Sequence, residues 1–453
     1  MTKYGLYKSF PDLWLQEIPE DWDAIKIKYL FGERSEKGYP EEPLLVSSQN
    51  MGVVPKDVFG NRTVEASKDL HLLKLVQIGD FVISLRSFQG GLEYAYYRGI
   101  ISPAYTILIP GEKIDGGYFR YLAKSVRFIE LLQMCVTGIR EGQNIDYMKL
   151  KNHLIPVPST VEQRKIAQYL DWQISKINRL IDAKKKEIHR LTELKKTVVN
   201  EAVTHGLSHD VPMKFSGVDW LGDIPAHWTT IKLRQILHPF SEKNHPELPL
   251  LSVVREQGVI VRNVEDKESN HNFIPDDLSG YKMVKKGQFA MNKMKAWQGS
   301  YGVSDYTGIV SPAYFIFDVD FENLEYFHYA IRSKVYVNFF AQASDGIRVG
   351  QWDLSINKMK EIPFIVPPAD EQQAIVEYIP VAFAKYDAAI EKLTEEVEVL
   401  HELRNKLISD VVTGQIDVRN IEVPEFEYVE ETEDVSDEDS EDDEDADSND
   451  EEV

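Results

Sequence analysis

Residues 162–203 read EQRKIAQYLDWQISKINRLIDAKKKEIHRLTELKKTVVNEAV and contain neither Gly nor Pro. Apolar side chains recur in steps of three and four, which places them on one face of a helix. The positions are Leu170, Ile174, Ile177, Ile181, Ile188, Leu191 and Val198, with Lys184 and Lys195 filling two gaps. Ser159 and Glu162 form a capping-box pattern before it. A helix of roughly 63 Å with so narrow a stripe needs a second long helix as its partner.

A second stretch, residues 371–411, supplies that partner. Its apolar positions follow the same steps: Ile375, Ile379, Phe383, Tyr386, Ile390, Leu393, Val397, Leu400, Leu407 and Val411. Pro380 predicts a kink or marks the start of the straight part of this helix. The two stretches predict a coiled coil within the chain. The alternative is that each is an ordinary amphipathic helix on a globular core.

An internal repeat organises the whole chain. Short motifs recur at an offset of 206 to 209 residues: Ile18-Pro-Glu-Asp-Trp22 and Ile224-Pro-Ala-His-Trp228, Ile101-Ser-Pro-Ala-Tyr105 and Val310-Ser-Pro-Ala-Tyr314, Gly138-Ile-Arg-Glu-Gly-Gln143 and Gly346-Ile-Arg-Val-Gly-Gln351, and Glu162-Gln163 and Glu371-Gln372. One repeat is therefore a globular module followed by a long helix. We call the two modules head 1 and head 2.

The sequence of each head predicts a small α+β module. Short apolar runs next to Gly, Ser and Pro predict strands at 44–46, 81–85 and 104–109 in head 1, and at 250–253, 289–291 and 313–317 in head 2. Short helices are expected near 117–124 and 324–332. The segment 206–212 predicts a loop between the repeats.

The charge of the chain is unevenly distributed. The net charge is −23 over 453 residues, but nineteen Asp and Glu lie in residues 421–453, so residues 1–420 carry only −4. This acidic tail is expected to be disordered. It could be a solubilising segment, or a polyanion that competes with DNA or contacts a partner. Cys135 is the single cysteine, and no signal peptide or membrane span is expected, which together indicate a reducing cytoplasm.

Sequence motifs for catalysis are absent. The chain has no dinucleotide or phosphate-binding glycine motif, no Gly-x-Ser-x-Gly elbow, and no Asn-Pro-Pro-aromatic stretch of the kind that amino-methyltransferases use. Glu201, His205 and His209 are spaced like metal ligands, but the second repeat has no counterpart, so we predict no metal site.

The two heads share scaffold motifs but differ at corresponding polar turns. Arg, Lys, Gln and Asn pair with base edges, and Arg and Lys also hold phosphates. The candidate DNA-binding residues are Gln49, Asn50, Arg86, Ser87, Gln89 and Arg140 in head 1, and Arg255, Gln257, Lys293, Lys295, Gln298 and Arg348 in head 2. The alternative for any one of them is an ordinary solvated loop. Arg140 and Arg348 belong to the repeated Gly-Ile-Arg motif, which suits either the DNA backbone or a structural bond.

The order of head, long helix, head and long helix resembles the specificity subunit of type I restriction–modification enzymes. The Ile-Pro-x-x-Trp, Gly-Ile-Arg-x-Gly-Gln and Glu-Gln motifs carry the resemblance, which covers about residues 10–418. It implies two target-recognition domains at 1–158 and 206–368, conserved-region helices at 159–205 and 369–418 packed as an antiparallel coiled coil, and a disordered acidic tail at 419–453.

The resemblance also implies the function. Each head would read one half of a split, asymmetric site on double-stranded DNA, and the helices would set the gap between the halves. The chain would be non-catalytic and bind no cofactor. Two methylation subunits would use S-adenosylmethionine to methylate adenine, and restriction subunits would use ATP and Mg²⁺ to translocate and cleave DNA in a prokaryotic cytoplasm.

Two other functions remain open on the residues alone. One is a structural adaptor whose heads bind protein, which would show no sequence-dependent binding to DNA. The other is a standalone methyltransferase, which would bind S-adenosylmethionine by itself.

Overall fold

The computed structural model describes residues 2–59, 69–137, 144–208, 210–219, 221–263, 274–275, 277–348 and 351–431. The chain divides into two compact units. Unit 1 comprises Met1–Lys185 and Glu395–Thr432, and unit 2 comprises Lys186–Thr394 and Glu433–Val453. The division passes through both long helices, so each unit holds one head and a part of each helix.

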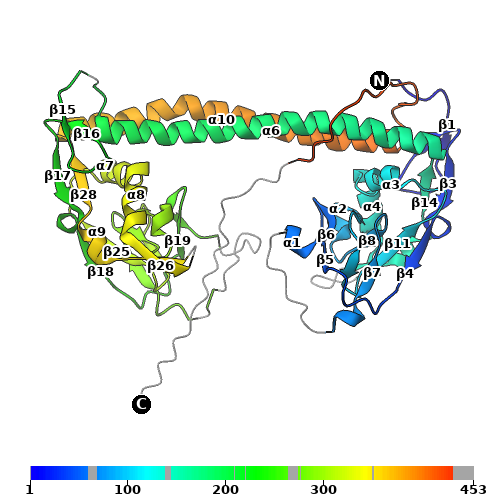
Figure 1. The fold of residues 1–453 in the computed structure, drawn as a ribbon, viewed down its shortest axis with the longest axis horizontal. Coiled ribbons are helices and arrows are strands. Elements are labelled where there is room, and N and C mark those ends of the chain that lie inside the picture. The colour runs from blue at the N-terminus through cyan, green and yellow to red at the C-terminus, as the bar shows by residue number, and fades with distance from the viewer. Residues whose placement is uncertain are drawn as a thin grey trace, which may run out of the picture. The chain divides into compact units, whose positions relative to one another are not determined.

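The two long helices are α6, Thr160–His205, and α10, Ala369–Val412. They span 46 and 44 residues and lie side by side (Figure 1). They extend the periodic stretches 162–203 and 371–411 by one or two residues at each end, and α10 ends before residue 418, the end predicted for the second conserved-region helix. Pro380 lies inside α10, which continues through it as one helix.

The helices run antiparallel within each unit. In unit 1, Lys184 pairs with Glu396, while Asn178 accepts a hydrogen bond from Arg404 at 3.1 Å, so rising numbers on α6 meet falling numbers on α10. In unit 2, Lys195 of α6 pairs with Asp387 of α10. The two lysines that interrupt the apolar stripe therefore form ion pairs between the helices. The predicted antiparallel coiled coil is confirmed.

Head 1 alternates short strands with short helices. Its elements are β1 Tyr7–Ser9, β2 Glu17–Pro19, β3 Asp23–Lys26, η1 Ile27–Tyr29, β4 Phe31–Arg34, β5 Leu45–Ser48, β6 Gly52–Pro55, α1 Lys56–Phe59, η2 Leu70–Leu72, β7 Lys74–Val76, β8 Phe81–Ile83, α2 Ser87–Gly90, β9 Glu93–Tyr94, β10 Gly99–Ile101, β11 Thr106–Pro110, α3 Gly116–Leu122, α4 Val126–Met134, β12 Val136–Thr137, β13 Asn144–Ile145, α5 Tyr147–Leu150 and β14 Leu154–Val157.

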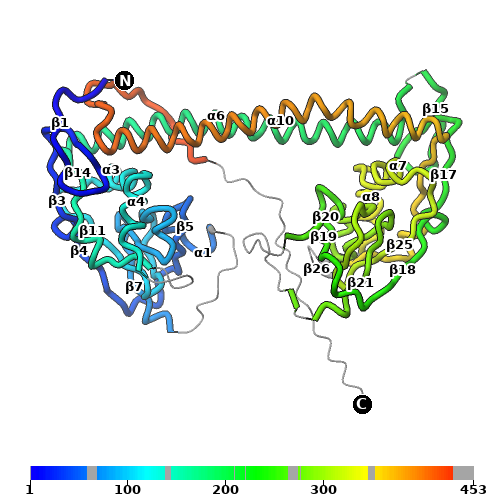
Figure 2. Tube along the Cα trace, turned by 180° about the vertical axis from the view of Figure 1, so that it is seen from behind, coloured from blue at the N-terminus to red at the C-terminus, as the bar shows by residue number. Residues whose placement is uncertain are grey.

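Head 2 repeats this order almost element for element (Figure 2). Its elements are β15 Met213–Phe215, β16 Asp223–Pro225, β17 Thr229–Lys232, η4 Leu233–Gln235, β18 Leu237–Phe240, β19 Leu251–Val254, β20 Gly258–Val261, β21 Lys282–Val284, β22 Phe289–Met291, η5 Ala296–Gln298, β23 Tyr301–Val303, β24 Gly308–Val310, β25 Phe315–Val319, α7 Leu324–Ile331, α8 Lys334–Ala343, β26 Ser344–Arg348, β27 Gln351–Leu354, α9 Ile356–Lys360 and β28 Pro363–Val366.

The same four-stranded antiparallel sheet forms the centre of each head. Its order is β4-β11-β8-β9 in head 1 and β18-β25-β22-β23 in head 2. The predicted strands correspond to β5, β8 and β11 in head 1 and to β19, β22 and β25 in head 2, and the predicted short helices correspond to α3 and α7. The α+β prediction with two similar heads is confirmed.

A tryptophan–glutamate pair joins each head to the start of its long helix. The buried Trp22 indole donates to Glu162 Oε1 at 3.1 Å, and the buried Trp228 indole donates to Glu371 Oε2 at 2.9 Å. The repeated motifs Ile-Pro-x-x-Trp and Glu-Gln are thus the two sides of one contact. The Glu162 amide donates to Ser159 Oγ at 3.3 Å as the capping box predicts, whereas the Glu162 carboxylate binds Tyr4 and Trp22.

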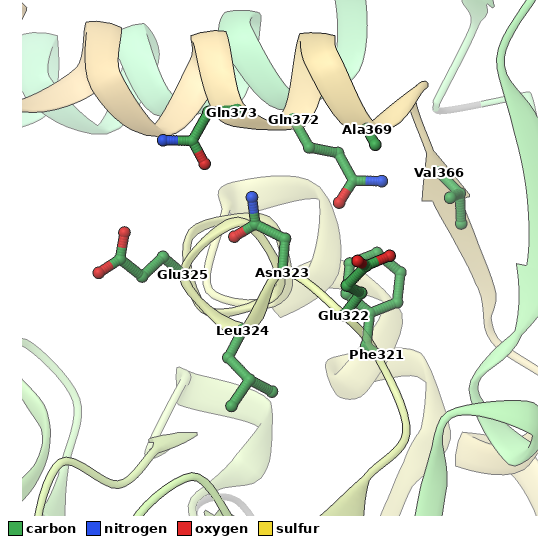
Figure 3. A pocket seen from close by; sticks show the side chains of 9 residues that line it. All are labelled: Phe321, Glu322, Asn323, Leu324, Glu325, Val366, Ala369, Gln372 and Gln373. Atoms are coloured by element: carbon green, nitrogen blue, oxygen red, sulfur yellow. The ribbon is translucent and has the colours of Figure 1, made fainter.

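The glutamines that follow these two glutamates, Gln163 and Gln372, make different sets of contacts. Gln163 donates to Lys113 O and Pro158 O and accepts from the Asp115 amide at 2.7 Å, which ties α6 to the start of α3. Gln372 donates to Pro367 O at 2.8 Å. It borders a hollow between α10 and the start of α7, lined in part by Asn323 and Gln373 (Figure 3).

The ends of the long helices are also equivalent. Gly206 follows α6 with φ +78°, and a Cβ there would lie 3.0 Å from the Trp228 ring. Gly414 follows α10 with φ +79°, and a Cβ there would lie 2.4 Å from Pro19. Only glycine adopts this left-handed conformation without strain, and it lets the chain turn against the head. The N-terminal segment packs here too, since Asp417 N donates to Thr2 O at 2.9 Å.

The first part of the acidic tail is ordered, although the sequence predicts disorder from residue 419. Residues 421–431, which we call the strap, lie along α6 in unit 1. Both backbone groups of Val429 are bonded there: its N–H to Ser175 Oγ at 3.1 Å and its C=O to Asn178 Nδ2 at 2.9 Å. Glu431 pairs with Lys185 and with Arg404, so it bridges the two helices. Residues 432–453 lie outside the described part.

We expect the strap to stabilise unit 1. A chain that ends at Glu431 should melt like the full-length chain, whereas one that ends at Asn420 should lose roughly 2 kcal/mol, because several hydrogen bonds of about 0.5–1.5 kcal/mol each disappear. Differential scanning calorimetry of the three chains measures this. Equal melting of the chains that end at 420 and 431 would show that the strap adds no stability.

Candidate nucleic-acid interface

The first candidate surface in head 1 is the turn between β5 and β6. These strands pair up to Ser48 and Gly52, and the turn exposes Gln49 and Asn50. Gly52 has φ +76°, and a Cβ there would lie 2.7 Å from Tyr94 O, so the hairpin packs closely on β9. The strands thereby hold two polar side chains in solvent on a tight turn.

The second surface in head 1 is the start of α2. Arg86 and Gln89 are exposed, while Ser87 is buried and its hydroxyl accepts the Ser84 amide at 2.8 Å. The structure brings this segment to the β5–β6 turn, because Gln49 Nε2 donates to Arg86 O at 3.5 Å. A Cβ on Gly90 would lie 2.7 Å from Gln49 Cδ, so the two loops are in contact. Ser87 therefore stabilises the turn, whereas Arg86 and Gln89 face solvent.

In head 2 the equivalent turn, between β19 and β20, exposes Arg255 and Gln257. An acidic residue lies between them. Glu256 is 3.6 Å from Arg255 Nε and 3.5 Å from Lys196 of α6. This turn therefore carries both signs of charge, whereas the turn of head 1 carries uncharged amides.

The loop that leads into η5 holds the other candidates of head 2. Lys293, Lys295 and Gln298 are half-buried, and Lys293 pairs with Asp353 of β27 at 3.2 Å. Trp297 packs on Trp352, with 5.1 Å between ring centroids. These contacts join the loop to the β26–β27 hairpin.

In the sequence, the repeated Gly-Ile-Arg motif falls between β12 and β13 of head 1 and overlaps β26 and β27 of head 2. Arg140 lies outside the described residues. Arg348 ends β26, and only its backbone is described. β13 contacts α2 in head 1, and β27 contacts η5 in head 2. The structure thus places each hairpin beside the polar loop of its own head.

Two functional candidates were not predicted from the sequence. Lys124, after α3, and Arg332, after α7, each bind the backbone of the candidate turn in their head. A comparison of the two repeats offers a signal, since Lys124-Ser125 and Arg332-Ser333 are 208 residues apart. Tyr96 and Tyr97 are exposed aromatic side chains near the turn of head 1.

Head 2 contains a half-buried histidine close to this surface. His328 accepts a hydrogen bond from the Val303 amide at 3.3 Å, and burial together with the Arg332 guanidinium lowers the pKa of His328 to about 4. Between pH 6.5 and 4 the unfolded chain therefore binds a proton at this site that the folded chain does not. Acid should destabilise head 2.

We expect His328→Asn to weaken this pH dependence, because the amide oxygen can accept the Val303 bond without titrating. Relative to the variant, the parent should lose about 2 kcal/mol of stability between pH 7.5 and pH 5, at about 1.4 kcal/mol per pKa unit. Urea unfolding at both pH values measures this difference. Identical pH dependence of the two chains would contradict a neutral His328 in the folded state.

The described residues offer little for catalysis. Among them, no three His, Cys, Asp or Glu side chains are grouped to hold a metal ion. His205 instead lies 3.2 Å from Glu201 within α6, and His209 is outside the described part. Cys135 is buried, and burial raises the pKa of its thiol to about 11. No helix in the described part is long and apolar enough to cross a membrane.

Two known proteins with similar sequences are described as specificity subunits of type I restriction enzymes. No family model matches the chain. It is 23% identical over 447 residues to the type I restriction enzyme MjaVIII specificity subunit of Methanocaldococcus jannaschii, covering 91% of this chain and 97% of that protein. It is 22% identical over 443 residues to the putative MjaX specificity subunit of the same organism, again with 91% and 97% coverage.

A solved structure has the same fold. It belongs to a study described as the structural basis of complex assembly and conformational transition of the type I R-M system. The match has a TM-score of 0.55 at 13% identity and covers 88% of this chain and 99% of that one. The similarity along nine-tenths of the sequence, together with this shared fold, confirms the resemblance of the chain to the specificity subunits of type I restriction enzymes.

Proposed function

We propose that this chain is the DNA sequence-recognition subunit of a type I restriction–modification complex, and that each head reads one half of a split, asymmetric site. The observation that carries the proposal is a shared scaffold with different side chains at equivalent turns. Gln49 and Asn50 in head 1 stand where head 2 has Arg255 and Glu256. Two such heads would prefer different half-sites.

The side chains at these turns suit direct reading of bases. Arginine pairs bidentately with guanine, and asparagine or glutamine with adenine, each worth about 1–3 kcal/mol of discrimination. Arg86, Gln89 and Gln49 are exposed on two loops that are in contact. Arg140 and Arg348, repeated in both heads, would suit a feature common to both half-sites, such as the phosphate backbone.

The chemistry would belong to partner subunits. The chain itself is a non-catalytic specificity subunit and would need no cofactor of its own. Two methylation subunits would transfer methyl groups from S-adenosylmethionine to adenine, and restriction subunits would use ATP and Mg²⁺ to cleave DNA. Residues 1–420 carry a net charge of only −4, so this chain alone would grip phosphates weakly. The partner subunits would supply much of the affinity for DNA.

The test is a map of methylated adenines. The chain is expressed with the methylation subunit of its own operon in a host that lacks other DNA methylation, and the genome is sequenced by a method that detects methyl-adenine. A split, asymmetric motif with a fixed gap should appear only when the chain is present. An active methylation subunit that gives the same pattern without the chain would favour the protein-binding adaptor instead.

A further inference from the structure

We propose that Lys124 in head 1 and Arg332 in head 2 are positioning residues. Each binds the backbone of the base-reading turn in its own head and thereby sets the specificity of that head. The proposal rests on the proposed function, because it assumes that the β5–β6 and β19–β20 turns read DNA. Neither residue is itself assigned a contact with DNA. Each acts through the backbone of the turn that it holds.

In head 1 the anchor is an ion pair beneath the turn. Lys124 Nζ donates to Gln49 O at 2.8 Å and to Glu93 Oε1 at 2.6 Å. Glu93 is 1% exposed, so the ammonium group is held between a buried carboxylate and the turn carbonyl. A charged donor forms stronger hydrogen bonds than a neutral one. The position of Gln49 is therefore tied to the core of the head.

The same residue also lies next to the second polar loop. Gly91 ends α2 with φ +87°, and a Cβ there would lie 2.1 Å from Ala123 O and 3.2 Å from Lys124 Cα. Leu92 N donates to Ala123 O at 3.3 Å. The segment that carries Arg86 and Gln89 is thus packed on the backbone of Lys124. Lys124 therefore contacts both polar loops of head 1 and fixes their positions relative to each other.

In head 2 the equivalent contact is made by a guanidinium group. Arg332 Nη2 donates to Arg255 O at 2.9 Å and to Glu256 O at 2.7 Å. Gln49 and Arg255 are the first residues of equivalent turns, so the same carbonyl is bound in both heads. A Cβ on Gly258, which has φ +78°, would lie 2.1 Å from Arg332 Nη1. The glycine leaves the space in which the guanidinium passes under the turn.

The surroundings of the two anchors differ. Gly302 occupies the place in β23 that Glu93 occupies in β9, because Gly302 pairs with Ala290 where Glu93 pairs with the equivalent Val82. Within the described residues, the Tyr301 hydroxyl and Arg332 Nη1 are buried without a hydrogen-bond partner. The cation of head 2 is therefore held by two turn carbonyls rather than by a buried carboxylate. Both carbonyl bonds come from the single nitrogen Nη2 of a rigid planar guanidinium, whereas the ammonium group of lysine ends a flexible four-carbon chain.

This difference predicts how each anchor can be replaced. Lys124→Arg should retain specificity, because a cation still reaches Gln49 O. Arg332→Lys should retain it only in part, because a flexible ammonium group replaces a rigid planar guanidinium that holds one nitrogen between the two carbonyls. Lys124→Met would leave Glu93 buried without its cation, so the informative variant is the double change Lys124→Met with Glu93→Gln. Arg332→Met needs no such partner.

The experiment uses the complex with the methylation subunit and the target found by methylome mapping. Initial methylation rates are measured on duplexes with the cognate site and with single base changes in either half. Arg86→Ala, an exposed change in head 1, identifies which half head 1 reads. The double variant should reduce discrimination in that half alone by about 5- to 100-fold, the range that one base contact supplies. Arg332→Met should do so in the other half alone.

The outcomes separate this proposal from the proposed function. Unchanged discrimination by both variants, with a parent complex that reads both halves, would overturn the anchors and leave the function intact. If the variants, Lys124→Arg included, lost discrimination in both halves of the site, the two residues would have a general structural role. That result would also overturn the proposal. A parent complex without sequence-dependent methylation would instead defeat the proposed function.

Discussion

Replacing Trp228 with alanine should lower the unfolding free energy of unit 2 by about 3–5 kcal/mol, the usual cost of removing a buried tryptophan. The side chain is fully buried, and its indole donates to Glu371 at the start of α10. Its ring also lies against Gly206 at the end of α6. One side chain therefore joins head 2 to the end of one long helix and the start of the other. Its loss leaves a cavity and removes one of the two partners of the Glu371 carboxylate, which His227 still contacts.

Hydrogen exchange read peptide by peptide measures this effect, since it reports each unit separately. Strands β22 and β25 should exchange much faster in the variant, whereas β8 and β11 of unit 1 should keep their protection. His227→Ala is the matched control. His227 also binds Glu371, at 2.6 Å, but on the surface, where such a pair contributes about 0–1 kcal/mol. Equal effects of the two variants, or faster exchange in both units, would contradict the assigned role of Trp228.

The Trp–Glu junction shows what repeated motifs can and cannot reveal. The sequence identifies both motifs and their spacing, but Trp22 and Glu162 are 140 residues apart, and no local pattern states that they touch. The capping-box pattern predicts that the Glu162 carboxylate turns back to its own helix. In the structure it binds Tyr4 and Trp22 instead, because the head packs on the helix end.

Local sequence patterns were sufficient for the long helices and for six strands, β5, β8, β11, β19, β22 and β25. They did not reveal α4 and α8, although Ser125 precedes α4 as an N-cap that accepts the Phe128 amide at 3.3 Å. Their apolar faces are short and read equally well as strands. The strap was missed for another reason. Its composition predicts disorder, and its order depends on Ser175, Asn178 and Arg404, which lie far away in the sequence.

In the candidate site, as in the fold, the sequence predicted local features but not tertiary contacts. Exposed polar residues at turns follow from local sequence, and the turns that hold Gln49 and Arg86 are exposed as expected. That these two loops touch, and that Lys124 or Arg332 holds a turn, depends on tertiary packing. Ser87 illustrates the limit, because it lies in the same loop yet is buried.

Replacing Pro380 with alanine should stabilise unit 2 by about 2 kcal/mol. Proline inside a helix lacks the N–H that would bind the carbonyl four residues earlier, at Val376, and costs about 3 kcal/mol. Part of this gain is offset, because proline also restricts the unfolded chain by about 0.4–1 kcal/mol. Pro380 is exposed, so the change removes little packing. The sequence alone suggested a kink or a helix start here, but α10 continues from Ala369 to Val412.

A glycine variant separates the missing hydrogen bond from the other effects. Pro380→Gly restores the N–H but adds the cost of glycine in a helix, about 1 kcal/mol, so stability should rise in the order proline, glycine, alanine. Urea unfolding, with hydrogen exchange at residues 374–384, measures the series. A less stable alanine variant would show that α10 requires the proline. In that case the residue would serve the shape of the helix, since its equivalent in α6 is Asp171, which binds Arg120 and Tyr121 of head 1. The two repeats would then use one position for different purposes: an anchor to the head in unit 1 and a local bend in unit 2.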